Sequence, residues 1–534
     1  MSEPRETSAP LRLALVIDPG PLSPAAQALI DWCRAQPALK VLQIFIGRPP
    51  DTPAPGRLRR LAVNLLLQVE SRLLRSFKPL ARPLRQFDPA HGDLPCQSLS
   101  PASPDTTLPA SLDLLVHLGN SPLPPDLLQR ARLGALRTWP ALAPVSASGI
   151  PCFDDVLRQR EQTGFALLHQ RPDGEARLVS GTLRTRFFTL LNQHFLFSKL
   201  RHYLQVQLLD IAACGEVRPT GPRAFVPPAP AAGFPGLSAT LSYAAGLCRI
   251  LASELVNRKL RRRFNRWNVG FARGDWRQLH LPQAHQIGNR PGHFIADPFV
   301  IRDASGDFCF VEDYDFDRQL GTIAAYRLHE RKADFLGEVI VEPHHLSFPF
   351  LFRHQGKLLM CPESSAARRI TLYESEAFPL RWRPVHTVMD KVCAADSLFF
   401  EHDGRWWLFT NIDPSNEEDC NAELMIFHAD SPLTDHWIPH AQNPIYIDSS
   451  KARNGGLIVE GDQIYRVSQR QGFNAYGTGH AIHRIVTLTP DEYLEETVLT
   501  RSPADFPGVD GSHHCHVDGD LCVFDFRRAE AVDR

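Results

Sequence analysis

Short apolar runs separated by glycine-containing polar turns recur through the C-terminal half of the chain. Residues 295–314 hold two such runs around a turn at Gly306, and the same arrangement repeats around Gly356, Gly404, Gly461 and Gly519. These glycines are 50, 48, 57 and 58 residues apart. Glycine reaches the positive φ that tight hairpin turns require. A repeat of about 50 residues built from hairpins is typical of a β-propeller, so five hairpins predict an all-β five-bladed propeller.

Closure of the ring needs a strand from outside the repeats. The last repeat ends near residue 526 and leaves no room for outer strands. We therefore expect residues 264–276 to complete the blade that contains Ser512. The alternative is a β-sandwich whose turn spacing is accidental.

The N-terminal half has a different periodicity. Residues 11–17 and 41–46 are continuous apolar runs typical of buried parallel strands, and residues 24–35 between them have helical spacing. Residues 58–77 predict an amphipathic helix and residues 112–118 another strand. This order predicts an open α/β sheet, which binds ligands at the carboxyl ends of its strands. No glycine-rich phosphate loop is present, so a nucleotide site has no support.

Breaks in these patterns divide the chain into five parts. We predict a disordered tail (1–10), an α/β domain (11–212), a proline-rich linker (213–236), a connecting helix (237–263) and the propeller (264–534).

Composition excludes several function classes. The formal net charge is −1, which argues against nucleic acid, and the basic run 258–263 is more typical of a helix end. The eleven cysteines form no Cys-x-x-Cys pair, which favours reduced thiols. We recognise no signal peptide and no apolar stretch long enough to cross a membrane. We therefore expect a cytoplasmic protein without a membrane span.

The segments 113–119, 134–140, 149–157 and 163–165 resemble the formyltransferase fold. That family uses an Asn, a His before Pro, and an Asp. Here Trp139 precedes Pro140, where the resemblance places the His, while Asn120 and Asp173 stand near the expected Asn and Asp. Without the His that would shuttle a proton, a folate donor is not expected to be used. We therefore expect a formyltransferase-like α/β domain with no cofactor.

Candidate chemistry in the propeller follows from its geometry. Inner strands of all blades begin around one axis, so their first residues converge. The sequence assigns five residues to these positions: Asp297, Ser347, Asp396, Asn454 and Ser512. Cleavage of a glycosidic bond needs one protonated and one ionised carboxyl group. Asp297 with Glu363 is the best pair, and Asp396 would tune a neighbour's pKa. Taken singly, each Asp is more typical of a strand-start cap or a turn acceptor.

Motifs of this half also resemble a known domain. They include Ala-Asp-Pro-Phe at 296–299, Ser-Phe-Pro-Phe at 347–350, Cys-Pro-Glu-Ser-Ser at 361–365 and Tyr-Arg-Val-Ser-Gln at 465–469. They look like the propeller that precedes the catalytic domain of glucosamine inositolphosphorylceramide transferases and, more distantly, like five-bladed arabinanases and invertases. The resemblance implies a glycan or glycoconjugate ligand and a separate glycosyltransferase as partner.

Further residues are candidates for binding rather than chemistry. The proposed substrate-binding set is His345, Ser347, Arg453, Asn454, Gln469 and Tyr476. His514 and His516 share a strand face and are weak candidates for a metal, although no metal is expected. Three functions stay open: glycosyl hydrolysis or transfer in the funnel, non-catalytic glycan recognition, and N-formylation of an amino sugar.

Overall fold

The computed structural model describes residues 9–47, 55–75, 85–86, 94–99, 111–143, 145, 149–226, 233–256, 263–279, 284–505 and 508–531. The chain forms two compact units, residues 1–249 and 250–534. Most of the predicted tail (1–10) and all but the last residue of the basic run 258–263 lie outside the described residues. The division between the units falls within helix α6 (Leu237–Leu255).

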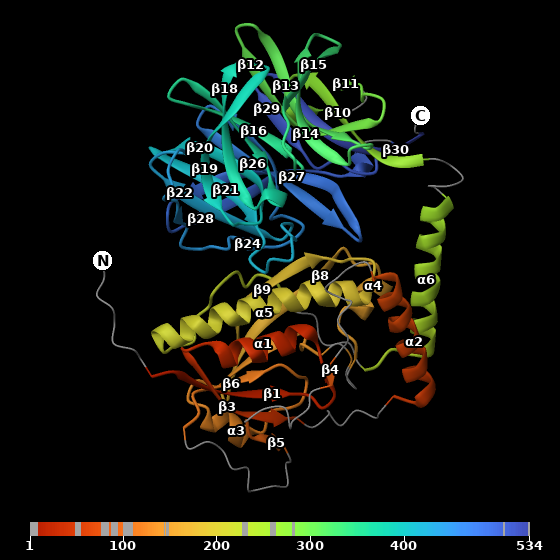
Figure 1. Ribbon diagram of the computed structural model, residues 1–534, viewed down its shortest axis with the longest axis vertical. Coiled ribbons are helices and arrows are strands. Elements are labelled where there is room, and N and C mark those ends of the chain that lie inside the picture. Colours follow the sequence, from red (N-terminus) through yellow and green to blue (C-terminus); the bar gives the residue numbers. More distant parts are fainter. Residues whose placement is uncertain are drawn as a thin grey trace. The chain divides into compact units, whose positions relative to one another are not determined.

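The first unit is built on a mixed seven-stranded sheet (Figure 1), which confirms the predicted open α/β sheet. The strand order is β5-β3-β1-β6-β7-β8-β9, and the first five strands run parallel. The strands are β1 (Leu11–Ile17), β3 (Leu39–Ile46), β5 (Cys96–Ser98), β6 (Leu114–His117), β7 (Ala135–Trp139), β8 (Gln162–Arg171) and β9 (Gly174–Arg184). A separate pair joins β2 (Pro21–Leu22) to β4 (Arg85–Gln86).

Helices lie at the predicted ranges 24–35, 58–77 and 237–263, while others, such as the helix Thr189–Cys214, were not predicted. They are α1 (Pro24–Ala35), α2 (Arg57–Leu73), α3 (Pro125–Arg130), α4 (Phe153–Leu157), α5 (Thr189–Cys214) and the start of α6. Ser23 caps α1 by accepting a hydrogen bond from the Ala26 N–H, and Pro24 suits the first helical turn. Part of the predicted linker packs on the sheet, because the Ser180 N–H donates to the Pro222 carbonyl at 2.7 Å.

The second unit confirms the five-bladed propeller. In its described part, four blades use consecutive strands, with β24 (Tyr446–Ile447) added beside β22. Blade 1 is β12 (His293–Asp303), β13 (Gly306–Asp315), β14 (Leu320–Leu328) and β15 (Ala333–Ile340); blade 2 is β16 (Ser347–His354), β17 (Lys357–Glu363), β18 (Arg369–Ala377) and β19 (Arg381–Asp390). Blade 3 is β20 (Ala394–His402), β21 (Arg405–Ile412), β22 (Glu423–Ala429) and β23 (Ile438–Pro439); blade 4 is β25 (Asn454–Glu460), β26 (Gln463–Gly472), β27 (Ala475–Leu488) and β28 (Tyr493–Arg501).

Blade 5 closes the ring as predicted. Strand β10 (Arg263–Arg273) pairs along its whole length with β30 (Leu521–Ala531), and the two lie side by side in Figure 1 although they are far apart in the sequence. The blade is completed by β29 (Cys515–Asp518) inside and β11 (His285–Ile287) outside. The first strand of every blade contacts the first strands of both neighbouring blades, so five inner strands surround the axis.

The turn glycines have the conformation that the repeat requires. Gly306, Gly356, Gly404, Gly461 and Gly519 all have positive φ. Aromatic and aliphatic side chains from blades 1 to 4 form one continuous core that includes Phe299, Phe350 and Trp407. No helix in the described part of the chain is long and apolar enough to cross a membrane. All eleven cysteines are free thiols.

A buried ion pair holds blade 4 together. Arg466 on β26 makes two hydrogen bonds to Glu495 on β28, at 2.8 and 2.7 Å, and both side chains are fully buried. Burial alone would raise the pKa of Glu495, but Arg466 outweighs burial and lowers it. The guanidinium also donates to the carbonyls of Lys451 and Ala452. The pair therefore fixes the backbone on which Arg453 stands.

We predict that Glu495→Gln lowers the free energy of unfolding of the propeller by about 3–5 kcal/mol, because it leaves Arg466 buried without its counter-charge. Glu496→Gln is the matched control: Glu496, next to Glu495 on β28, pairs at the surface with Arg484 on β27, and an ion pair there contributes less than about 1 kcal/mol. Urea denaturation of both variants measures the difference. Equal stabilities would contradict the structural role of the buried pair.

The structure separates two residues of the formyltransferase comparison. Asn120 follows the carboxyl end of β6, whereas Asp173 lies in the turn between β8 and β9. Strand β8 runs antiparallel to β7, with Gln170 opposite Ala135, so this turn lies at the amino edge of the parallel strands. Asn120 and Asp173 therefore lie at opposite edges of the sheet. The expectation that these two residues together match the family's catalytic Asn and Asp is wrong.

We predict that the chain transfers no formyl group from a folate donor to amino sugars, because Trp139 cannot shuttle a proton and no Asn–Asp pair forms. Mass spectrometry of amino sugars incubated with the donor and the full chain tests this. Donor-dependent transfer that is lost in Asn120→Ala would overturn the prediction.

Candidate functional site

The bulges of the inner strands determine which side chains reach the axis. In blades 1 and 3 one extra residue interrupts the ladder between the first two strands, after Ala296 and after Ala395. Asp297 and Asp396 follow these alanines and have φ of 49° and 48°. A left-handed conformation costs about 1–2 kcal/mol for a residue other than glycine. Bulges re-aim side chains, and here they place one carboxylate of each blade toward the axis.

Blade 2 corrects the predicted alignment. Its bulge follows Ser347, so the residue with the left-handed φ of 47° is Phe348. Ser347 matches Ala296 and Ala395 rather than the two aspartates. Phe348 is fully buried, and its ring packs against Phe299 with centroids 4.9 Å apart. The prediction that Ser347 is equivalent to Asp297 is therefore wrong by one residue.

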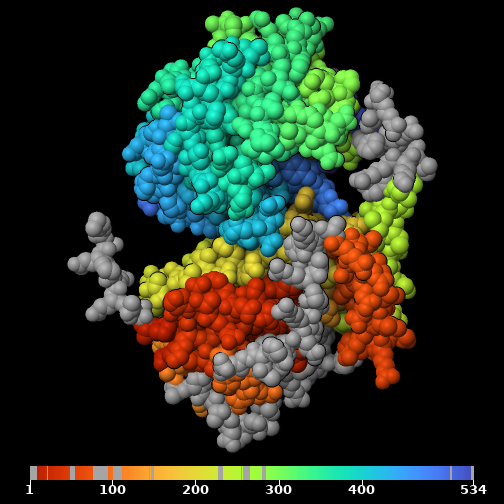
Figure 2. Space-filling view, viewed as in Figure 1, coloured from red at the N-terminus to blue at the C-terminus, as the bar shows by residue number. Residues whose placement is uncertain are grey.

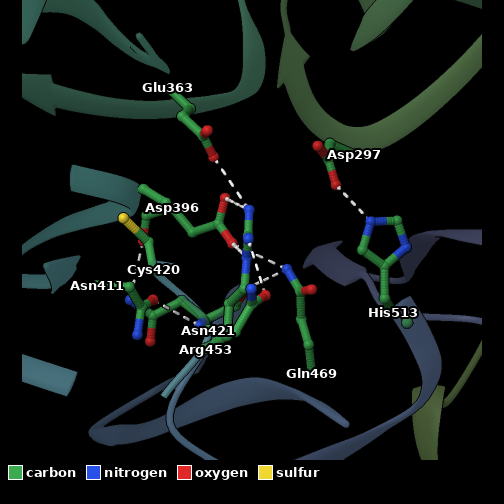
Figure 3. Close-up of polar contacts among 12 residues, drawn as sticks. Asp297, Glu363, Asp396, Asn411, Cys420, Asn421, Arg453, Gln469 and His513 are labelled. Atoms are coloured by element: carbon green, nitrogen blue, oxygen red, sulfur yellow. Dashed lines mark hydrogen bonds and ion pairs between the residues drawn. The ribbon is translucent and has the colours of Figure 1, made fainter. Parts of the chain in front are cut away.

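Arg453 joins two of the predicted carboxylates, and Figure 3 shows both pointing at its guanidinium group. Its Nε lies 2.6 Å from Asp396 Oδ2, and its Nη2 lies 3.2 Å from Glu363 Oε2. Nη1 donates to Asn421 Oδ1 at 3.1 Å. Arg453 precedes β25 of blade 4, whereas the two carboxylates belong to blades 3 and 2. One side chain thus connects three blades.

Asp396 is buried and depends on this contact. Burial raises the pKa of Asp396, and the Glu363 and Asp297 carboxylates act in the same direction, whereas Arg453 opposes the rise. Gln469 Nε2 also donates to Asp396 Oδ2, at 2.9 Å. Two donors therefore oppose the effect of burial, but burial dominates and the pKa of Asp396 stays well above its usual range.

Asp297 joins a different group. Its Oδ1 lies 3.1 Å from His513 Nε2, while His513 Nδ1 lies 2.8 Å from Asp525 Oδ2 (Figure 3 draws the first contact). Burial works to lower the pKa of His513, but the Asp525 and Asp297 carboxylates outweigh it and raise the pKa to about 10. His513 is therefore an imidazolium held between two carboxylates at neutral pH. Asp297 and Glu363, proposed as one catalytic pair, each contact a different cation.

A further contact of a carboxylate with a basic group, between Glu312 and His345, was not predicted. Glu312 lies opposite Ala296 in the ladder, and its Oε1 is 3.2 Å from His345 Nε2. The Gly321 N–H donates to His345 Nδ1, so the other ring nitrogen carries the proton toward Glu312. Burial raises the pKa of Glu312, although the contact with His345 opposes the rise. We call Asp297, Glu312, Glu363, Asp396, Asp525, His345, Arg453, Gln469 and His513 the axial cluster.

A positional signal for Glu312 and Asp525 was present in the repeat. Each lies six residues after its turn glycine, and Glu363 lies seven residues after its own. The equivalent position holds Asn411 in blade 3 and Ser468 in blade 4, again seven residues on. Glu312 and Asp525 could have been found by aligning the second strands of the repeats as well as the first.

The remaining candidates have mixed surroundings. Asn454 is fully buried, and its amide donates to the carbonyls of Asp396 and Phe409, so it supports Asp396 rather than facing a ligand. The Tyr476 ring lies 5.1 Å from the Arg453 guanidinium carbon and 5.1 Å from the His513 ring centroid. Tyr476 therefore lies close to both charged groups, and it is partly exposed.

Of the two histidines proposed as metal ligands, His514 lies near a carboxylate, with its Nδ1 3.9 Å from Asp297 Oδ1. His514 and His516 both pack against Phe299, as expected for one strand face. His516 Nδ1 accepts from the Val300 N–H, and burial lowers the pKa of His516 to about 3. The three described groups close enough to share an ion are Asp297, His513 and Asp525. Protonated His513 already supplies the positive charge between those carboxylates.

Comparison with known proteins finds relatives of the second unit. Residues 282–517 match the family model described as "Glucosamine inositolphosphorylceramide transferase 1, N-terminal". Glucosamine inositolphosphorylceramide transferase 1 of Oryza sativa subsp. japonica is 36% identical over 217 residues, which cover 40% of this chain and 29% of the relative. The protein of that name from Arabidopsis thaliana is 35% identical over 214 residues, 39% of this chain and 28% of the relative. The chain thus spans less than a third of the curated relatives it matches.

Solved structures share sequence with this chain only at low identity. Zg3597, a family 117 glycoside hydrolase of Zobellia galactanivorans, is 11% identical with a TM-score of 0.33, and the match covers 51% of this chain and 93% of that one. The α-L-arabinanase of Penicillium chrysogenum is 11% identical with a TM-score of 0.30, covering 49% and 80%. Identities this low say nothing of activity. The second unit of this chain carries a propeller similar to the N-terminal part of the glucosamine inositolphosphorylceramide transferases, as its sequence motifs indicated.

Proposed function

We propose that the propeller recognises a glycoconjugate that carries an amino sugar, and that the axial cluster binds the sugar's ammonium group without cleaving a glycosidic bond. The observation that carries this proposal is the contact of one guanidinium, Arg453, with both Asp396 and Glu363. In this role the protein works beside a separate glycosyltransferase.

Cleavage of a glycosidic bond requires a carboxylic acid that gives up a proton and a second carboxylate that stays ionised. Arg453 donates hydrogen bonds to both Asp396 and Glu363 and so occupies carboxyl oxygens that would otherwise face a glycosidic oxygen. Asp297 faces the imidazolium of His513 in the same way. Carboxylates held in this manner are hydrogen-bond acceptors, which bind hydroxyl and ammonium groups.

Carboxyl groups outnumber basic groups in the axial cluster. It holds five carboxyl groups against three basic groups, namely Arg453, His513 and His345. Carboxyl oxygens accept hydrogen bonds from ammonium groups, so this excess suits an amino sugar, which is an ammonium ion at neutral pH. The curated relatives are named for glucosamine and inositolphosphorylceramide, which supports the same class of ligand. The side chain of His345 is 39% exposed, so one edge of the cluster meets solvent.

A second candidate function is hydrolysis or transfer of a glycosyl group. The observation that favours it is Glu312, whose pKa is raised by burial and which interacts electrostatically with Asp297. A raised pKa suits a general acid, and Asp297 would then be the base or nucleophile. This pair replaces the predicted combination of Asp297 with Glu363.

We predict that methyl glucosaminide binds at least about tenfold more tightly than methyl N-acetylglucosaminide, because acetylation removes the ammonium charge. Glu363→Gln should reduce the affinity for the amine by about tenfold or more, the effect of losing a charged hydrogen bond of about 1.5–3 kcal/mol. Isothermal titration calorimetry measures both. Glu496→Gln, at the surface of blade 4, serves as the control. Equal affinities for the two sugars would refute recognition of the ammonium group.

We predict that Asp297→Asn and Glu312→Gln alter sugar affinity by no more than a few kcal/mol, and that the unmodified chain releases no sugar from a nitrophenyl glycoside. Absorbance of nitrophenol measures release. Turnover by the unmodified chain that both substitutions abolish, with folding and binding retained, would establish the second candidate in place of the first.

A further inference from the structure

Helix α2 of the first unit has two apolar faces. One face is buried and includes Val63, Leu66 and Glu70. The other consists of five aliphatic side chains that are 40% to 71% exposed: Leu58, Leu61, Leu65, Val69 and Leu73. At about 100° per residue these five lie within roughly a third of the helix circumference. We call these five residues the α2 stripe; Figure 2 shows α2 in orange-red at the surface.

The buried face accounts for the attachment of α2 to its unit. Glu70 accepts hydrogen bonds from the N–H groups of Thr189 and Leu190 at the start of α5, and from the hydroxyl of Tyr243 on α6. The α2 stripe lies on another side of the helix and contributes nothing to these contacts. Isolated exposed apolar residues are ordinary, but a continuous stripe on one helix marks a surface for interaction.

Charge indicates the kind of partner. All five arginines of this segment are exposed: Arg57, Arg59, Arg60, Arg72 and Arg75. The segment's single acidic residue, Glu70, is buried and bound to α5. A second copy of the chain docked through α2 would bring arginines against arginines. A partner with negative charge at its surface and apolar groups beneath it complements both features.

We propose that α2 docks on the surface of a membrane that contains anionic phospholipids. The helix lies parallel to the membrane plane, with the α2 stripe among the acyl chains and the arginines at the phosphate groups. A basic helix with one apolar face binds membranes in this way, by apolar burial together with attraction to anionic lipid. The inference rests on α2 alone and is independent of the function proposed for the propeller.

Flotation of the full chain with vesicles tests the proposal. We expect the chain to float with vesicles of phosphatidylcholine and phosphatidylserine in a 70:30 ratio, and at least tenfold less with pure phosphatidylcholine. Leu61→Glu/Leu65→Glu should reduce binding at least tenfold. Arg57→Gln/Arg72→Gln/Arg75→Gln should reduce binding to anionic vesicles about a hundredfold, since each basic residue near such a surface contributes about fivefold.

Leu380→Glu/Leu433→Glu provides the matched control, because these leucines lie in exposed turns of the propeller. This variant should bind vesicles as the unmodified chain does. The proposal is overturned if the chain binds neither vesicle, or if it binds both equally. It is also overturned if sedimentation shows a dimer that Leu61→Glu/Leu65→Glu dissociates, because the α2 stripe would then be the contact between two copies.

Discussion

The guanidinium of Arg453 is the interaction on which the candidate site depends. It reaches Asp396 of blade 3 and Glu363 of blade 2 from the start of blade 4. Its backbone position is set by Arg466, which pairs with Glu495 and donates to the carbonyls of residues 451 and 452. A buried ion pair thus holds the segment that carries a second ion pair. This arrangement gives the buried Asp396 a guanidinium partner that opposes the rise of its pKa on burial.

Contacts between polar side chains of different blades also occur elsewhere around the propeller axis. Glu312 of blade 1 contacts His345, which precedes blade 2, and Asp297 of blade 1 contacts His513, which precedes β29 of blade 5. Between blades 4 and 5, Ser512 Oγ lies 3.0 Å from His480 Nδ1. Polar contacts therefore connect each blade to another near the axis. They also compensate much of the carboxylate charge, which favours recognition of a ligand over proton transfer to one.

Much of the architecture was predictable because it depends on local chemistry. Glycines such as Gly306 and Gly356 mark the hairpins through their positive φ, and their spacing predicts the blades. The position of each bulge depends on pairing between strands, which the sequence does not show locally. For this reason Ser347 was matched to Asp297, although Phe348 is the residue of blade 2 equivalent to Asp297. The contact of Arg453 with Glu363 spans 90 residues of sequence and has no local signal.

The central claim is that the axial cluster holds a sugar without attacking its glycosidic bond. A crystal structure of the chain with methyl glucosaminide tests it most directly. The account predicts that the sugar nitrogen lies within hydrogen-bonding distance, about 2.6–3.2 Å, of a carboxylate of the cluster, and that the glycosidic oxygen lies beyond that distance from every carboxyl oxygen. A glycosidic oxygen held between Asp297 and Glu312 at that distance, or a cleaved sugar in the site, would contradict it.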